Sequence, residues 1–574
     1  MEKQTYGAMV DLLVKGFEAG RISRRRIMEM AVKIPALAGA LAAAGHLRSA
    51  SAAGVPSLNG ISVRAQEGAA GGELTYGNER IVSDTLNQHR SNDTLSRMIA
   101  RHVLDNLVAV NPADGSIHPW LAESWEISED GLTYTFKLRQ DVTFHDGTPF
   151  NAEAVKRNFD ETMDPDKSPG FAYTAMGSTS YVGTEVVDEF TVKVTFNKPF
   201  AAFLLYLSDG GTGIDSPTAL DAGGENYGIT SLVGSGPYKF VEWIQTDRVT
   251  LEKNPDYNWP SPAFGVTGPT PLDKLIFREV PESSVRAQAV IQGELQMARI
   301  VEPSVPELEG QSGVTIIATP KAGSTRMFLM NTAKAPTDDI NVRKAINMAI
   351  DKEAMLQLPG WAGYGRPGLA PLPSNMVPNG DLSSLEQYDI PYDIDGANAL
   401  LDEAGWVLNG DVREKDGVQL VLDMVTTTID VDNGQIEPID GFLNEAGIKL
   451  NIRAGDFNFW IDTVQKGDFH MTLMSDSGYI AVGIIQEFFR EGEPFANYGL
   501  KNPDLNAAID AAVSAANLDE QWTHLFEAMA IVLQEVVGVM GWEQDYLDAV
   551  SDRVQNVMFN EVGFPYFYGA SLAE

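Results

Sequence analysis

The chain has 574 residues and no cysteine, and this absence limits its possible folds more than any other feature. Its stability has to come from buried apolar surface, which a chain of this length with 44% hydrophobic residues can provide. Disulfide scaffolds, thiolate metal sites, iron–sulfur centres and cysteine nucleophiles are excluded. A lipoprotein anchor, which needs an acylated cysteine, is excluded as well. At about 150 residues per domain, the length allows three or four domains.

Charge is distributed unevenly along the chain. The formal net charge is −37, yet residues 1–65 carry nine Lys or Arg and only four Asp or Glu. This asymmetry indicates that the leader and the body meet different surroundings. The acidic body excludes a general nucleic-acid binder, because neutralising phosphates requires clustered basic residues.

The leader has the order of a bacterial export signal. A basic run, Ser23 to Arg26, precedes a small-residue apolar stretch over 34–45, which is shorter than the roughly 20 residues that span a bilayer. Ala50-Ser51-Ala52 and Val63-Arg64-Ala65 are possible cleavage sites. We therefore predict a twin-arginine-type signal peptide over 1–65, a flexible tether over 66–72 and an exported, extracytoplasmic protein. An ordinary basic N-terminal helix is the alternative.

Strand and helix patterns alternate through the body. Period-two alternation predicts strands over 132–139, 190–196, 238–243 and 248–253. Helical spacing predicts helices that begin at Asn151 and Asn341, one over 397–404 that ends at Gly405, and one over 522–536. The mixture favours an α/β or α+β fold without a fixed internal repeat.

The motifs of common catalytic sites are absent. The seven histidines form no His-x-x-x-His pair, and no Gly-x-Ser-x-Gly or P-loop is present. The glycine-rich run 363–368 does not follow an apolar strand, so it is interpreted as a loop. We expect no enzyme activity, cofactor or metal; a secreted hydrolase is kept as an alternative, since acidic residues are abundant.

A series of phrases then becomes recognisable in chain order. They are Leu-Ala-Glu-Ser-Trp at 121–125, Asp-Gly-Leu-Thr-Tyr-Thr-Phe-Lys-Leu-Arg at 130–139, Val-Thr-Phe-His-Asp-Gly-Thr-Pro-Phe at 142–150, Ala-Glu-Ala-Val-Lys at 152–156, Gly-Ser-Gly-Pro-Tyr-Lys-Phe at 234–240, Asn-Pro-Asp-Tyr at 254–257, Val-Arg-Lys-Ala-Ile-Asn-Met-Ala-Ile-Asp at 342–351, Ala-Leu-Leu-Asp-Glu-Ala-Gly-Trp at 399–406, Asn-Tyr at 497–498 and Asn-Pro at 502–503. Over about residues 73–569 the chain resembles the family 5 extracytoplasmic solute-binding proteins of ABC importers, the dipeptide, oligopeptide and nickel type.

The resemblance implies a two-lobed, periplasmic-binding-protein-like type II fold with a hinge cleft. By analogy, the first lobe covers 73–99, 231–322 and 496–574, and an extra subdomain of that lobe covers 100–230. The second lobe covers 323–495, so the chain is expected to cross the hinge near Gly323 and near Asn497. The implied partners are the permease and ATPase subunits of an ABC importer, with the protein itself a monomer. A signalling role on the same fold is a further alternative.

The resemblance also directs attention to a set of candidate ligand contacts. In peptide binders of the family, an acidic residue near a Trp-x-x-Asp segment pairs with the amino terminus of the peptide, and Asp476 occupies the matching stretch. The Trp and the following Asp-Pro-Asp are replaced here. We expect a peptide-like solute first and an oligosaccharide or opine second. A nickel chelate is disfavoured because no histidine cluster is present. The candidate contacts are His89, Arg90, Trp361, Tyr364, Arg366, Trp460, Asp476, Tyr479, Asn497 and Tyr498.

Overall fold

The computed structural model describes residues 71–82, 84–91, 93–112, 115–164, 166–168, 172–173, 176–177, 180–358, 364–432, 434–476, 478, 480–560 and 562–573. The predicted leader, most of the tether, Trp361 and Tyr479 lie outside these ranges. Within the described part of the chain, no helix combines the length and apolarity needed to cross a bilayer.

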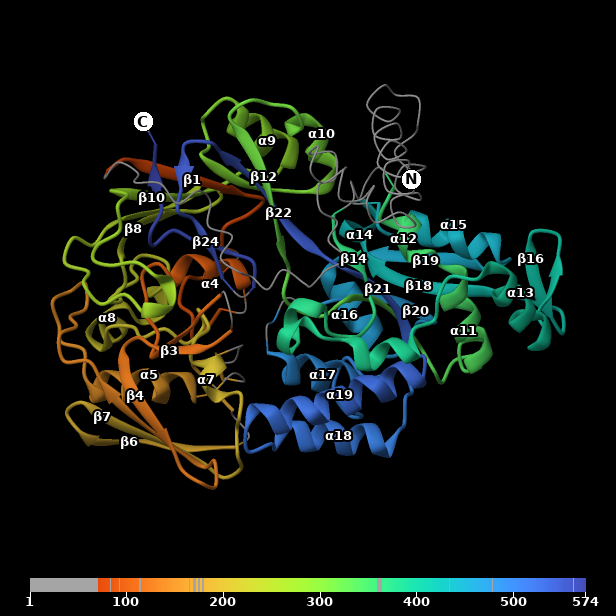
Figure 1. Ribbon diagram of the computed structural model, residues 1–574, viewed down its shortest axis with the longest axis horizontal. Coiled ribbons are helices and arrows are strands. Elements are labelled where there is room, and N and C mark those ends of the chain that lie inside the picture. Colours follow the sequence, from red (N-terminus) through yellow and green to blue (C-terminus); the bar gives the residue numbers. More distant parts are fainter. Residues whose placement is uncertain are drawn as a thin grey trace, which may run out of the picture. The chain divides into compact units, whose positions relative to one another are not determined.

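A seven-stranded sheet forms the centre of what we call the first lobe (Figure 1). Its strands, in spatial order, are β12 (Val314–Pro320), β22 (Asp545–Ser551), β11 (Met297–Ile300), β1 (Glu73–Asn78), β10 (Lys274–Glu279), β9 (Arg248–Lys253) and β8 (Tyr238–Ile244). Strand β1 is parallel to β10 and β11, and the remaining pairs are antiparallel. The helices of this region are α4 (Thr94–Ala100), α9 (Ser283–Ile291), η3 (Glu302–Ser304) and α10 (Val305–Leu308).

A six-stranded sheet forms the centre of the second lobe. Its strands, in spatial order, are β14 (Arg366–Pro367), β21 (Gly538–Glu543), β13 (Arg326–Met330), β20 (Met471–Met474), β18 (Val421–Thr427) and β19 (Lys449–Gly455). The helices are α11 (Ile340–Ala349), α12 (Lys352–Met355), η4 (Ser374–Met376), η5 (Pro378–Gly380), η6 (Ser383–Tyr388), α13 (Ile394–Glu403), α14 (Thr428–Asp432), α15 (Glu437–Glu445), α16 (Phe457–Gln465), α17 (Ala481–Phe489), α18 (Pro503–Val513) and α19 (Leu518–Gln534). A small sheet of β15 (Val407–Asn409), β16 (Val412–Lys415) and β17 (Val418–Gln419) follows α13.

A four-stranded antiparallel sheet with its own apolar core lies between the first-lobe segments in sequence. Its strands are β4 (Ala122–Ile127), β5 (Thr133–Leu138), β7 (Thr191–Phe196) and β6 (Tyr181–Asp188), accompanied by α5 (Ala152–Thr162), α7 (Phe203–Tyr206), α8 (Pro217–Gly223) and η1 (Gly224–Asn226). The remaining short elements are the pairs β2 (Val108–Val110) with β3 (Ile117–Pro119), β23 (Val554–Gln555) with β26 (Ser571–Leu572) and β24 (Met558–Phe559) with β25 (Pro565–Tyr566), and η2 (Pro262–Phe264).

The period-two and helical patterns are confirmed as elements. The side chains of Tyr134, Phe136 and Leu138 lie on one face of β5 and point into the core, as their alternation predicts. Asn151 caps α5 by accepting a hydrogen bond from the backbone N–H of Ala154 at 3.1 Å. Helix α11 begins one residue before the predicted start, because Asp339 rather than a later residue supplies its N-cap.

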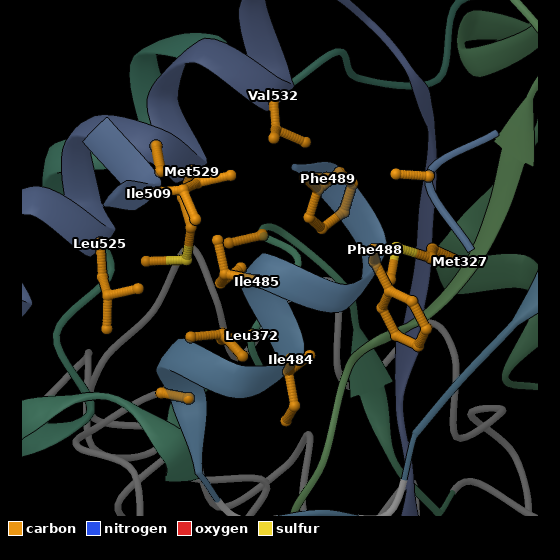
Figure 2. Close-up of a cluster of buried hydrophobic side chains, with 14 of the residues drawn as sticks. Met327, Leu372, Ile484, Ile485, Phe488, Phe489, Ile509, Leu525, Met529 and Val532 are labelled. Atoms are coloured by element: carbon orange, nitrogen blue, oxygen red, sulfur yellow. The ribbon is translucent and has the colours of Figure 1, made fainter. Parts of the chain in front are cut away.

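Both faces of the second-lobe sheet are covered. Along β13, Met327 and Leu329 belong to one buried cluster, whereas Phe328 and Met330 belong to another on the opposite face. The first cluster contains α17, α18 and α19 side chains, and Figure 2 shows Phe488 and Met327 close to each other within it. A strand buried on both faces has nearly continuous apolar residues, as Met327 to Met330 of β13 do.

The chain passes between the two sheets at two places, which we call the junction: residues 321–325, between β12 and β13, and Gln544, between β21 and β22. The first passage contains Gly323. The second differs from the expected position near Asn497. Strand β21 hydrogen-bonds to β13 inside the six-stranded sheet, so the chain remains in the second lobe for a further 40-odd residues.

Candidate ligand-binding site

The two passages of the junction are bonded to each other. The backbone N–H of Lys321 donates to the carbonyl of Gln544 at 2.9 Å, and the Lys321 ammonium donates to the Gln544 side-chain oxygen at 3.4 Å. Strands β12 and β22 pair in register up to this point, with Pro320 opposite Asp545. The connection between lobes is therefore a narrow, paired strip rather than two independent loops.

Arg366 spans the second passage. Its Nε donates to Glu543 Oε2 at 3.0 Å, and its Nη2 lies 3.6 Å from Asp545 Oδ1. Glu543 also accepts hydrogen bonds from the backbone N–H and the hydroxyl of Ser374, at 2.9 and 2.7 Å. Burial raises the pKa of Asp545, and the Arg366 cation opposes that rise. Arg366 thus contacts one carboxylate on each side of Gln544.

Three parallel strands of the second lobe end at one edge of its sheet, and two of them, β20 and β18, end close to the junction. Asp476 lies just beyond β20, and Asp430 just beyond β18, whose neighbour β19 is followed by Asp456. Ligands of open α/β sheets bind outside the carboxyl ends of such strands, where the loops diverge. The polar residues that follow these strands are therefore placed where a solute is expected to bind.

Asp476 is held against the junction by its backbone. Its N–H donates to Ser324 Oγ at 2.8 Å, and its carbonyl accepts from the Ser324 N–H at 3.2 Å. Its Oδ1 accepts from the N–H of Gly478. Within the described residues Asp476 forms no ion pair, so this carboxylate is available to a cationic ligand group.

Several ionisable groups of both lobes surround the first passage. Arg326 pairs with Asp430 at 3.1 Å, and burial lowers the pKa of this arginine. Burial, together with the nearby Arg326 and Arg299, lowers the pKa of Lys321 to about 8. Burial raises the pKa of Glu302, against the pull of Arg326 and Lys321.

An acidic pair lies beside a tyrosine of the subdomain. Burial and the carboxylates of Asp476 and Glu493 raise the pKa of Glu487, on α17, to about 7. Tyr206, on α7, belongs to the same buried cluster as α17, and a Cβ added at Gly483 would lie 3.3 Å from its hydroxyl. Burial and the charges of Asp209, Asp476 and Glu487 raise the pKa of this tyrosine. The subdomain therefore contacts the second lobe close to Asp476.

Two of the predicted ligand contacts, His89 and Arg90, lie between the first lobe and the subdomain. His89 is fully buried, with Nδ1 2.9 Å from Thr162 Oγ1 and Nε2 3.1 Å from Asp215 Oδ2. These partners account for its position without a ligand. Arg90, next to it, is half-buried, and its guanidinium has no bonded partner within the described residues.

Tyr364 and Trp460 lie apart from each other. Tyr364 packs against an apolar cluster of the first lobe that includes Val290 and Leu308, although its chain neighbours belong to the second lobe. Trp460, on α16, is stacked between Phe457 and Phe495, with ring centroids 5.5 and 5.9 Å apart, and its indole N–H donates to Thr472. Trp460 therefore fills the second-lobe core.

Asn497 and Tyr498 lie at a separate position in the second lobe. Tyr498 is buried and donates its hydroxyl hydrogen to the Phe488 carbonyl at 3.0 Å. Asn497 is exposed and donates to the Gln465 carbonyl. Asn497 also lines a pocket of about 400 Å³ together with Glu491 and Lys501.

The structure thus gathers Arg366 and Asp476 around the junction, with Tyr364 nearby in the chain, and separates them from the other described candidates. Sequence reasoning missed Lys321, Gln544 and Glu487. Lys321 carried a signal, since it lies two residues before Gly323, where a hinge crossing was expected. The described residues hold no group of three or more His, Cys, Asp or Glu side chains arranged to bind a metal ion.

Solved structures with similar folds support this architecture. Over 87% of this chain, the structure matches all of NikA from Brucella suis in complex with Fe(III)-EDTA, with a TM-score of 0.76 and 24% identity. Over 88% of the chain it matches 99% of the periplasmic binding protein DppA from Helicobacter pylori in complex with the peptide STSA, with a TM-score of 0.70 and 23% identity. These similarities show the two-lobed fold.

Sequence comparison identifies the family. Glutathione-binding protein GsiB of Pectobacterium atrosepticum is 36% identical over 323 residues, and that of Escherichia coli is 35% identical. Each alignment covers 56% of this chain and 59% of the relative, so the chain spans under two thirds of the length of these relatives. Residues 116–482 match the family model described as bacterial extracellular solute-binding proteins, family 5 Middle. The chain belongs to the family 5 bacterial extracellular solute-binding proteins.

Proposed function

We propose that this protein is the extracytoplasmic solute-binding component of an ABC importer, and that it captures a small peptide-like solute between its lobes. The observation that carries the peptide assignment is Asp476, a carboxylate without an ion pair in the described structure, fixed at the carboxyl end of β20 against the junction. A buried or half-buried carboxylate without a counter-ion is a suitable partner for the free amine of a peptide. The glutathione-binding relatives support the same class of solute.

The mechanism is ligand-dependent closure. A solute that contacts both lobes favours the closed conformation by its difference in affinity for the two forms. The paired strip at Lys321 and Gln544 is where the backbone angles change, because it is the covalent connection between the sheets. The closed form then docks on the membrane permease, whose ATPase subunits power import.

We assign the lobes accordingly. The first lobe takes 73–99, 231–322 and 545–573, the extra subdomain takes 100–230 and the second lobe takes 323–543. Tyr364, Arg366 and Asp476 remain candidate ligand contacts at the junction, together with Trp361 and Tyr479 by their position in the chain. His89, Trp460 and Tyr498 have internal partners, which favours a structural role.

A ligand screen tests this assignment. The exported protein is unfolded, dialysed and refolded to remove any co-purified solute, then titrated in a thermal-shift assay with glutathione, di- and tripeptides, oligosaccharides, opines and nickel–histidine. A ligand at about 100 times its dissociation constant adds about 2.7 kcal/mol to the unfolding free energy. A shift with peptides alone supports the proposal, whereas a shift with sugars, opines or the nickel complex alone contradicts it.

Two controls separate the alternatives. Mass spectrometry of the ligand after incubation recovers it intact if the protein is a binder, while cleaved product indicates a hydrolase. Uptake of the radiolabelled ligand by cells that lack the gene falls if the role is transport and persists if the role is signalling. Sedimentation of the ligand complex tests the expectation of a monomer.

The export route is tested separately. The leader lies outside the described residues, and its proposed twin-arginine character rests on Arg24 and Arg25. Changing both arginines to lysine is expected to stop export and leave the full-length precursor in the cytoplasm. Normal extracytoplasmic yield of this variant would contradict the twin-arginine assignment.

A further inference from the structure

Among the described residues, Lys321 is a cation that forms no ion pair within 4.0 Å. Its only hydrogen bond through the side chain within the described structure is the 3.4 Å contact with the neutral Gln544 amide, and the ammonium lies 5.6 Å from the Tyr546 ring. The two nearby arginines already have carboxylate partners: Arg299 pairs with Asp548, and Arg326 pairs with Asp430. In the described part of the chain, the Lys321 ammonium therefore forms no ion pair of its own, although Asp476, Asp430 and Glu302 lie within electrostatic reach of it.

Asp476, which follows β20, is an anion held beside the same passage by its backbone. Two hydrogen bonds connect its backbone to Ser324, three residues after Lys321. Asp476 lies close enough to Lys321 to raise the pKa of this lysine, yet no ion pair within 4.0 Å joins them. A ligand that carries both an anion and a cation can bridge two such groups with charge-assisted hydrogen bonds.

We propose that Lys321 and Asp476 together bind a free α-amino-acid head group, with Asp476 accepting from its ammonium and Lys321 donating to its carboxylate. This inference rests on the proposed peptide-binding function and specifies its substrate class. A charge-assisted contact of about 2.8 Å is expected at each end of the head group. Arg326 and Arg299 add positive potential on the carboxylate side.

Such a site would distinguish γ-linked from α-linked glutamyl peptides. A γ-glutamyl peptide such as glutathione carries an ammonium and a carboxylate on the same carbon. An ordinary α-linked peptide has an amino-terminal ammonium, but its adjacent carboxyl group is consumed in the peptide bond. The α-linked isomer would leave the Lys321 ammonium desolvated and unpaired. This cost to the wrong ligand discriminates between the isomers more strongly than the additional contact made by the right one.

The charged surroundings of Lys321 provide a second readout. Arg326 and Arg299 lower the pKa of this lysine, Asp476 and Asp430 raise it, and Glu302 faces it from η3. Since the pKa is about 8, the lysine is partly deprotonated at pH 8.5 and takes up a proton when a carboxylate binds. Calorimetry in two buffers of different ionisation enthalpy measures this proton uptake directly.

The experiment uses the exported protein and four probes: glutathione, its α-linked isomer, the analogue that lacks the γ-glutamyl α-carboxylate, and N-acetylglutathione. Calorimetry with the wild type is expected to give glutathione a preference of about tenfold to hundredfold over each of the other three. In Lys321→Gln, the preferences over the α-linked isomer and the decarboxylated analogue should disappear, together with the proton uptake. Lys321→Arg should restore the preferences.

A matched control is Lys334→Gln. It changes the net charge equally, but Lys334 pairs with Asp423 and Asp468 elsewhere in the second lobe, so the preferences should persist. Thermal unfolding verifies that each variant is folded, and Lys321→Met replaces Lys321→Gln if the latter is not. Unchanged preferences in either neutral variant overturn the inference. Equal wild-type affinity for both isomers overturns it while leaving peptide binding intact, whereas no binding of any peptide defeats both.

Discussion

Arg366 and Asp545 belong to different sheets and face each other across Gln544, with Nη2 and Oδ1 3.6 Å apart. Nε of the same arginine lies 3.0 Å from Glu543, which precedes Gln544 in the second-lobe sheet. A rotation of one sheet relative to the other would change the Asp545 distance far more than the Glu543 distance, because only Asp545 is beyond the passage. The interaction of the Arg366 guanidinium with Asp545, and with it the stability of the junction, therefore depends on the orientation of the two lobes.

Removing this cation should destabilise the protein. Arg366→Met leaves Glu543, which is nearly fully buried, without its ion pair. We expect a loss of about 2 kcal/mol in unfolding free energy by urea titration at pH 7, moderated because the guanidinium itself is partly exposed. In the double variant with Glu543→Gln, the loss should be smaller than the sum of the single losses. Strict additivity would show that the two residues do not interact.

The His89–Asp215 pair should act on stability rather than on ligand selection. Both side chains are almost completely buried, so His89→Leu removes one partner of the Asp215 carboxylate, which keeps its hydrogen bonds from Tyr227 and Gln88. We expect a loss of about 1–3 kcal/mol in denaturant unfolding. Affinities of the variant for the four glutathione probes should keep the wild-type ratios. A selective change in those ratios would place His89 among the ligand contacts.

Trp460 should likewise behave as a core residue. Trp460→Ala removes an indole stacked between two phenylalanines and its hydrogen bond to Thr472. The expected cost is about 3–5 kcal/mol of unfolding free energy. Trp460→Phe, which keeps the stacking, should recover most of it. A variant that is fully stable but binds ligand poorly would reverse this interpretation.

Glu487 predicts a pH dependence of stability. Its pKa is raised from about 4.5 to about 7 in the folded protein, so the folded form binds more protons than the unfolded form between these values. The stabilisation of the folded state by Glu487 is therefore complete at low pH and is lost as the pH rises through 7. Glu487→Gln should be more stable than the wild type at pH 8, by about 3 kcal/mol at most.

The measurement compares urea unfolding of the two proteins at intervals from pH 4.5 to 8. Burial also raises the pKa of Asp105 to about 7. Asp105 contributes equally to the wild type and the variant, so the difference between their unfolding free energies isolates the effect of Glu487. A flat difference curve would show that Glu487 titrates normally.

Asp476→Asn tests the amine contact. The amide retains an oxygen that can accept from Gly478 N–H, so the turn after β20 should form and the unfolding free energy should change little. The affinity for glutathione should fall by about 2–5 kcal/mol, because the ammonium loses its counter-ion. The affinity for N-acetylglutathione, which lacks the ammonium, should hardly change. An equal loss for both ligands would point to a general disturbance of the site.

The sequence predicted local elements well where one pattern controlled them. The alternation around Tyr134 and Phe136 and the cap at Asn151 depend on neighbouring residues, and both were recovered. The candidate site was less predictable. Trp460 and Tyr498 are candidates because aromatic residues suit both pockets and cores, and a one-dimensional pattern does not distinguish the two roles. The signal of Lys321 was only its position beside the expected hinge at Gly323, and it was overlooked because a single lysine forms no periodic pattern.

The sequence by itself determined the mixed α/β class and the family, because phrases and periodicities are local and survive without coordinates. Tertiary structure alone decided that the second passage lies at Gln544, since only strand pairing shows that β21 belongs with β13. It also bonded the backbone of Asp476 to Ser324, three residues after Lys321, although Lys321 and Asp476 are 155 residues apart in the chain. Charge complementarity at a site depends on such long-range proximity, which no sequence spacing encodes.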